Sequence, residues 1–114
     1  MTDCLFCKMV HGEIKPRMVL ETDELIAFED INPQAPTHVL VVPRKHIATP
    51  NDIGSEDTAL IGKLVLAARK IAAERQLSES GYRLVMNCNR GGGQTVFHIH
   101  LHLLGGRQMT WPPG

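Results

Sequence analysis

The sequence predicts an α+β fold built on a mainly antiparallel five-stranded sheet, with one long helix and a short N-terminal helix. Two observations predict it. Five short strand-like segments surround a single long amphipathic stretch. The connections between these segments are too short for repeated β-α-β crossovers, which favours antiparallel pairing. A length of 114 residues suits one compact domain that spans residues 1–114.

The five strands are expected where apolar and β-branched residues gather between turn residues: 18–21, 25–29, 37–42, 82–87 and 95–104. The first two strands flank an acidic turn at residues 22–24 and therefore predict a hairpin. Pro43 ends the third strand, because proline has no N–H to donate to a neighbouring strand.

Both helices follow from the spacing of apolar residues. Residues 4–13 carry apolar side chains at near-helical intervals and predict the short helix. Residues 55–77 predict the long helix, with Ser55 as its cap. Its apolar stripe repeats at four- and three-residue steps and comprises Leu60, Leu64, Ala68 and Ile71.

The composition excludes several classes of protein. Twelve basic and 12 acidic residues give a formal charge of zero, so no global charge attracts nucleic acid or an anionic membrane. The 43% hydrophobic fraction is that of an ordinary globular protein. The start of the chain has no basic and apolar leader, and three cysteines fit poorly with a secreted disulfide framework. We therefore expect a cytoplasmic protein.

Three alternating histidines, at positions 98, 100 and 102, form the most informative pattern in the chain. In a strand, alternate side chains lie on one face about 6.7 Å apart. The intervening side chains are apolar and predict a core-facing side: Phe97, Ile99, Leu101 and Leu103. The imidazoles therefore face a cleft or polar site. Two chemistries fit there: the histidines bind a metal, or one attacks phosphorus while its neighbours hold the phosphoryl oxygens.

A glycine-rich loop precedes the histidines. Residues 91–93 are all glycine, which lets the backbone turn sharply and approach a ligand closely. Gln94 and Thr95 add side-chain donors. A loop that binds anions and leads directly into the histidines favours phosphate chemistry, although a triple glycine also fits a flexible hairpin loop.

Residues 98–104 resemble the H-φ-H-φ-H-φ-φ signature of the histidine-triad (HIT) family, where φ is apolar. Residues 30–38 are similar to the ribose-binding segment of that family, and residues 92–98 to its phosphate loop. The ending, residues 104–109 and 111–114, is similar to the Hint branch, and the diadenosine-polyphosphate hydrolase branch departs from it. The resemblance covers essentially the whole chain.

The resemblance implies a purine nucleoside 5′-phosphoramidate hydrolase that releases AMP or GMP and an amine. The nucleophile would be His100, which attacks the α-phosphorus and holds a nucleotidyl-imidazole intermediate that water hydrolyses. A neutral imidazole suits this role because its ordinary pKa is about 6.5. His102 and His38 would flank the phosphoryl group and assist protonation of the departing amine, with Thr95 as a further catalytic residue.

The resemblance also implies the contacts to the nucleotide. Asp30 would accept hydrogen bonds from the ribose hydroxyls, and Phe6, Phe28 and Ile31 would wall the base pocket. The phosphate oxygens would be bound by Thr95 and by the backbone of Gly93, Gln94 and Val96, beside His100 and His102. Asn87, at the end of the previous strand, would contact the same region.

Cys4 and Cys7 form a C-x-x-C pair. The resemblance implies that they bind a structural zinc ion together with His46 and His98, while catalysis requires no cofactor. Two reduced thiols near the N-terminus are the alternative.

The resemblance further implies a homodimer with twofold symmetry, formed through the long helix and an edge strand so that the sheet continues across it. Trp111 would then reach toward the partner's site. Three alternatives for the function stay open: a nucleotide-binding regulatory module with vestigial turnover, a dinucleoside polyphosphate hydrolase, and a zinc hydrolase.

Overall fold

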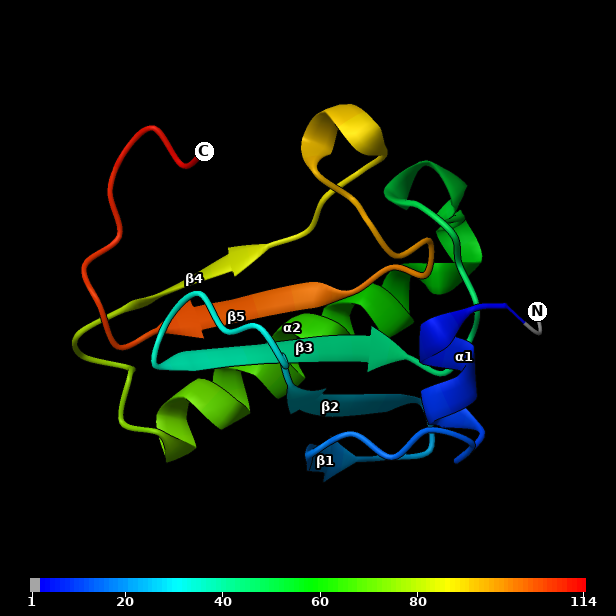
Figure 1. The fold of residues 1–114 in the computed structure, drawn as a ribbon, viewed down its shortest axis with the longest axis horizontal. Coiled ribbons are helices and arrows are strands. Elements are labelled where there is room, and N and C mark those ends of the chain that lie inside the picture. The colour runs from blue at the N-terminus through cyan, green and yellow to red at the C-terminus, as the bar shows by residue number, and fades with distance from the viewer. Residues whose placement is uncertain (1–2) are drawn as a thin grey trace.

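The computed structural model describes residues 3–114, which fold around one five-stranded antiparallel sheet (Figure 1). Met1 and Thr2, which belong to the expected domain, lie outside the described residues. The strand order is β1-β2-β3-β5-β4. The elements, in chain order, are α1 (Leu5–Val10), β1 (Met18–Glu21), β2 (Leu25–Glu29), β3 (Thr37–Pro43), α2 (Thr58–Glu74), β4 (Tyr82–Val85) and β5 (Leu101–Gly105), with single 3-10 turns at Pro50–Asp52, Ser55–Asp57 and Arg90–Gly92. The predicted fold class is confirmed.

The two helices cover opposite faces of the sheet. Alternate residues of β3 point to different sides: Val39 and Val41 pack in the cluster that contains α2, and Leu40 and Val42 pack in the cluster that contains Phe6 of α1. Every residue of β3 is therefore buried. Figure 1 shows α2 running behind the sheet and α1 beside the start of β2 and the end of β3.

The first three strands follow the predicted pattern. β1 and β2 have the expected bounds and pair antiparallel as a hairpin. β3 is one residue longer than expected, because Pro43 still lies opposite Leu25 at its end.

The long helix is shorter than predicted. Residues 55–57 form a 3-10 turn instead of the first helical turn, and α2 begins at Thr58. The side chain of Ser55 makes no cap; its carbonyl accepts the hydroxyl of Thr58, 2.8 Å away. The helix ends at Glu74, and Gln76 has a φ of +62° that cannot continue it. The predicted stripe is confirmed, with Leu64, Ala68 and Ile71 buried and Leu60 packed beside them.

The predicted bounds of the last two strands and of the short helix were too wide. β4 ends at Val85 instead of residue 87, and α1 covers six residues instead of the expected ten. β5 begins only at Leu101, since the preceding residues bond elsewhere: the N–H of Ile99 donates to the carbonyl of Ile47, 2.7 Å away. Phe97 was expected to face the core, but it is 48% exposed and lies outside the core. No helix in residues 3–114 is long and apolar enough to cross a membrane.

Candidate functional site

The histidines gather on the face of the sheet that α1 covers. The ring of Phe6, on α1, meets those of His98 and His100 edge-on, with centroids 6.0 and 5.0 Å away. The centroids of His100 and His102 are 4.9 Å apart, and those of His102 and His38 are 5.2 Å apart. The predicted one-sided arrangement is thus observed, although the first two histidines precede β5.

His100 has one ring nitrogen fixed by the main chain. Its Nδ1 lies 2.8 Å from the carbonyl oxygen of His98, which can only accept, so Nδ1 carries the proton. Nε2 therefore carries the lone pair. Burial lowers the pKa of His100, partly offset by the bond to His98 and by Asp30. The ring is neutral at pH 7, the state that a nucleophile requires.

His38 and His102 form a directed pair. The backbone N–H of Gln34 donates to Nδ1 of His38, 3.0 Å away, so the proton of that ring sits on Nε2. His38 Nε2–H then donates to Nδ1 of His102 at 2.9 Å, which leaves His102 with a proton on its own Nε2. Burial, followed by the proximity of His100 and His38, lowers the pKa of His102 to about 4. His102 is therefore a neutral hydrogen-bond donor at its outer nitrogen.

Asp30 adds a carboxylate to this pair. One oxygen accepts the N–H of Asn32 at 2.8 Å, and the other lies 3.4 Å from Nε2 of His38. The ligand atoms of Asp30, His38 and His102 lie within 4.8 Å of one another, close enough to hold a metal. The hydrogen bond from Gln34 argues against a metal there, because it places a proton on the His38 nitrogen that would have to ligate.

The three residues expected to wall a base pocket do not all lie together. Phe6 and Phe28 are both 3% exposed, and their rings pack edge-on with centroids 5.5 Å apart. Ile31 is 96% exposed and packs against neither ring. Of the three apolar residues expected to wall a base pocket, Phe6 and Phe28 therefore lie together, and Ile31 lies apart from them.

The glycine-rich loop uses several of its own donors. The N–H of Gly93 donates to Arg90 and the N–H of Gln94 to Asn89, so neither amide is free to bind phosphate. Within residues 3–114, the N–H groups of Thr95 and Val96 and the hydroxyl of Thr95 have no protein acceptor. These three donors remain for a ligand. The amide of Asn87 lies beside the loop, 4.0 Å from the place where a Cβ on Gly93 would stand.

Four predicted metal ligands converge between α1 and the sheet: Cys4, Cys7, His46 and His98. Cys4 Sγ lies 3.4 Å from Nδ1 of His98, and Cys7 Sγ lies 3.2 Å from Nδ1 of His46. His98 Nε2 donates to the carbonyl of Pro43 at 2.7 Å, so its lone pair faces the thiols. Burial and the neighbouring Cys4 raise the pKa of Cys7 to about 11. Two thiols and two ring nitrogens fit the donor set of a closed tetrahedral zinc site.

A comparison with family models matches residues 11–109 to the HIT domain. The chain belongs to the HIT family. The resemblance inferred from the sequence is thereby confirmed.

Named relatives of this HIT domain include enzymes. It is 47% identical over 107 residues to the purine nucleoside phosphoramidase of Escherichia coli K12, covering 94% of this chain and 90% of that protein. A structure of a HIT family hydrolase from Legionella pneumophila has a TM-score of 0.97 and 59% identity, over 98% of this chain and 100% of that one. A histidine triad protein from Clostridium difficile gives 0.93 and 40%, with 96% of each chain covered. These relatives support a hydrolase.

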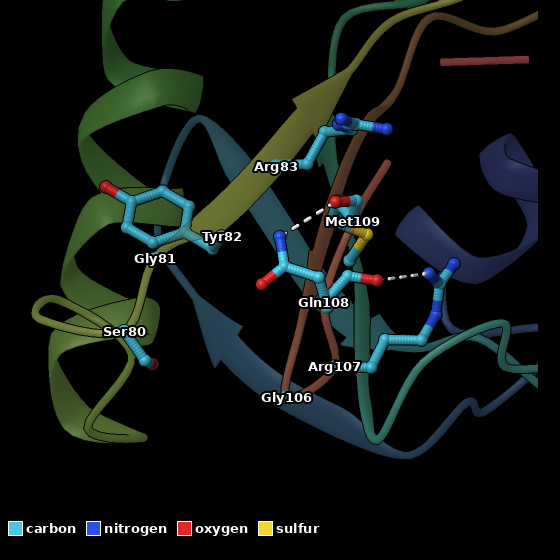
Figure 2. Close-up of a pocket in the computed structure, with 8 residues that line it drawn as sticks. All are labelled: Ser80, Gly81, Tyr82, Arg83, Gly106, Arg107, Gln108 and Met109. Carbon is cyan, nitrogen blue, oxygen red and sulfur yellow. Dashed lines mark hydrogen bonds between the residues drawn. The ribbon is translucent and has the colours of Figure 1, made fainter. Parts of the chain in front are cut away.

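A pocket of about 540 Å³ lies away from the histidines of this HIT domain, between β4 and residues 106–109 (Figure 2). None of the predicted site residues lines it. A second pocket, of about 360 Å³, opens beside Thr95 and two of the candidate metal ligands, Cys4 and His46. The larger pocket is therefore not part of the candidate site.

A backbone carbonyl was expected to fix the tautomer of His100, but the sequence did not identify which residues supply the three main-chain groups in the HIT domain's site: the N–H of Gln34 and the carbonyls of Pro43 and His98. Each fixes the tautomer of one histidine. Backbone groups are the same in every residue, so no side-chain pattern could have signalled them.

Proposed function

We propose that this HIT domain is a purine nucleoside 5′-phosphoramidate hydrolase that acts through a covalent nucleotidyl-histidine intermediate. One observation carries the proposal: the main chain holds the proton of His100 on Nδ1, which leaves Nε2 as a nucleophile beside the donor His102. The identity to a purine nucleoside phosphoramidase supports the substrate class.

In the proposed reaction, Nε2 of His100 attacks the α-phosphorus and the phosphorus–nitrogen bond breaks. Nε2–H of His102 donates a hydrogen bond to the departing nitrogen, which takes up a proton from solvent, because an amide anion is a poor leaving group. The amine leaves, and the nucleotidylated ring of His100 carries a positive charge. Water then attacks phosphorus, gives up one proton to solvent and frees His100 as a neutral ring, so AMP or GMP leaves.

We propose contacts to the nucleotide from the same geometry. Asp30 accepts from the ribose hydroxyls, and the Phe6–Phe28 pair walls the purine. The phosphate oxygens accept hydrogen bonds from the free donors of Thr95 and Val96 and from the side-chain amide of Asn87. Three other predicted residues do not contact the substrate directly. His38 orients His102, while Gly93 and Gln94 hold the shape of the loop.

The decisive experiment mixes the protein briefly with a slow adenosine phosphoramidate and measures its intact mass. We expect an adduct of one AMP that maps to His100. His100→Ala should lose the adduct, and its turnover should fall by on the order of 10³-fold or more, as is usual when a covalent nucleophile is removed. AMP binding should survive. His11→Ala, at an exposed histidine, serves as the matched control.

Other outcomes would replace the proposal. Binding of AMP without cleavage by the unmodified protein would favour a regulatory nucleotide-binding module. Faster cleavage of a dinucleoside polyphosphate than of the phosphoramidate would favour a polyphosphate hydrolase. Turnover that survives in His100→Ala and stops with a chelator would favour a zinc hydrolase.

We propose that the Cys4, Cys7, His46 and His98 cluster binds a structural zinc ion that catalysis does not require. The closed set of four ligands supports this, because it has no open position for substrate. A reducing cytoplasm would keep both thiols available to the metal.

We propose a twofold homodimer through β4 and α2. β4 is an edge strand, and Val65 and Leu66 of α2 are 43% and 54% exposed. Pairing there would cover an open strand edge and exposed apolar side chains together. It would also bring Trp111, which is 83% exposed, toward a partner's site.

A further inference from the structure

The side chain of Gln94 is buried in the glycine-rich loop, with 5% of its surface exposed. Its Oε1 accepts the N–H of Asn89 at 2.8 Å, and its Nε2 donates to the carbonyls of Ala48 at 2.7 Å and Val96 at 3.0 Å. Both amide donors and the acceptor oxygen are therefore used by main-chain groups. No side-chain donor of Gln94 is left for a substrate.

These bonds close the loop at both ends. Asn89 opens the loop with φ +60° and ψ −178°, a conformation that non-glycine residues rarely adopt and that surrounding contacts must hold. Gln94 holds it twice, because its own N–H also donates to the carbonyl of Asn89 at 3.0 Å. At the other end, its bond to the carbonyl of Val96 orients the peptide that follows the free donors of Thr95 and Val96.

The same side chain ties the loop to its neighbour in space. Ala48 lies two residues after the predicted zinc ligand His46. The carbonyl of Ile47, between them, accepts the N–H of Ile99, one residue before His100. The loop and the histidine segment are thus bonded to the same short stretch of chain.

We infer that Gln94 is a positioning residue: its amide holds the loop in the shape that aims the Thr95 and Val96 donors at the nucleotide phosphate, and it does not contact the substrate. The inference rests on the proposed function, since it deepens the role of the phosphate loop. It replaces the expectation that Gln94 itself donates to phosphate.

The test uses two variants of the full chain. Gln94→Met keeps the length and loses all three hydrogen bonds, and Gln94→Asn keeps the amide on a stem too short to reach all partners. AMP and adenosine are the probes, because they differ only in the phosphate. We expect Gln94→Met to weaken AMP binding and to lower kcat/KM, each by about tenfold or more, with adenosine affinity unchanged. Gln94→Asn should show a smaller loss.

Hydrogen exchange separates positioning from direct contact. In the ligand-free protein, the amide of Asn89 should exchange faster in Gln94→Met than in the parent, because its acceptor is gone. If Gln94 touched the phosphate directly, AMP binding would weaken while this exchange stayed unchanged, and the inference would be overturned. Unchanged AMP affinity with lower stability would also overturn it, since it would leave Gln94 a purely structural role.

Gln76→Met is the matched control. Gln76 is exposed beyond the end of α2, and its side chain has no protein partner within residues 3–114, so all readouts should match the parent. Failure of the proposed function is visible separately: a parent protein that never forms the His100 adduct would refute the hydrolase. The AMP, adenosine and exchange measurements need no turnover and still decide the role of Gln94.

Discussion

Main-chain groups assign a different task to each histidine of the site. His98 donates a hydrogen bond from Nε2 to the carbonyl of Pro43, so the lone pair on its Nδ1 faces the thiols. His100 donates from Nδ1 to the carbonyl of His98, so its lone pair is on Nε2. Neighbouring rings in one short segment thus have opposite tautomers. Because the fixing groups are backbone atoms, substitution of surrounding side chains leaves these assignments in place.

Acid should destabilise the fold through His102. Burial, followed by His100 and His38, lowers the pKa of this ring from 6.5 to about 4. Between these values the unfolded chain binds a proton there and the folded chain does not, so stability falls as the pH falls. The contribution should be roughly 1–2 kcal/mol, allowing for solvent at the partly exposed ring.

Denaturant unfolding of the parent and of His102→Gln between pH 7 and 4 measures this contribution. The variant should show a shallower loss of stability, whereas His11→Gln, at the surface, should follow the parent. Equal pH dependence in parent and His102→Gln would contradict the assignment.

Asp30 should distinguish ribose from deoxyribose. Its carboxylate is the proposed acceptor for the sugar hydroxyls, so Asp30→Ala should weaken AMP binding by about tenfold, the usual scale of a charged hydrogen bond. Binding of 2′,3′-dideoxy-AMP should hardly change. Calorimetric titration of both nucleotides into Asp30→Ala and into Asp23→Ala, an exposed aspartate, checks it. Parallel losses for both nucleotides would place Asp30 elsewhere.

At the scale of elements, the sequence predicted periodic segments well and their ends poorly. β1 and β2 were predicted to the residue because turn residues bound both, and the stripe of α2 was predicted by its spacing. The start of β5 was missed because Ile99 bonds to Ile47, a contact between distant segments. Such contacts override local alternation and leave no trace in it.

The α2 stripe should carry a large share of the stability. Leu64 is fully buried between α2 and the sheet, so Leu64→Ala should lower the free energy of unfolding by about 2–5 kcal/mol. Lys70→Ala, on the exposed side of the same helix, should change it by less than about 0.5 kcal/mol. Urea unfolding of both variants tests the contrast, which similar values would refute.

The stability of α1 should depend on zinc binding at the proposed site. Its cap Cys4 and its buried Cys7 are two of the four proposed zinc ligands. At a zinc concentration 100-fold above the dissociation constant, binding adds about 2.7 kcal/mol, so a chelator should lower the melting temperature by on the order of 10 °C.

Phosphoramidate turnover by the folded protein should survive chelation. Metal analysis should find one zinc per chain in the parent and in Cys88→Ser, and none in Cys7→Ser. Zinc retained by Cys7→Ser would refute the ligand set.

For the whole molecule, the sequence predicted which residues gather at the site better than it predicted their detailed geometry. The proposed zinc ligands, at positions 4, 7, 46 and 98, do converge, as do Asp30, His38 and His102. The sequence could not predict which backbone donors stay free, since the N–H groups of Gly93 and Gln94 are hydrogen-bonded inside the loop. It also could not predict that Ile31 faces solvent. Those outcomes depend on the three-dimensional closure of the loop.

If the proposed dimer forms through α2, a charge introduced on the exposed apolar side of this helix should prevent dimerisation. Val65→Glu should shift the protein from dimer to monomer, because pairing would bury an uncompensated carboxylate. Lys15→Glu, an exposed change after α1, should leave the dimer intact. Sedimentation equilibrium of the three proteins decides, and a parent that is monomeric at all concentrations would refute the dimer.

The ring of His98 belongs to the candidate zinc site, and its carbonyl accepts a hydrogen bond from His100, with one residue between the two histidines. Because only one residue separates them, inserting a single amino acid there would displace the candidate zinc site from the proposed nucleophile His100. The glycines at 91–92, where an added Cβ meets no close contact, should accept a longer chain. Variation in length among functional descendants of this sequence should therefore collect before Gln94 and be absent between His98 and His102.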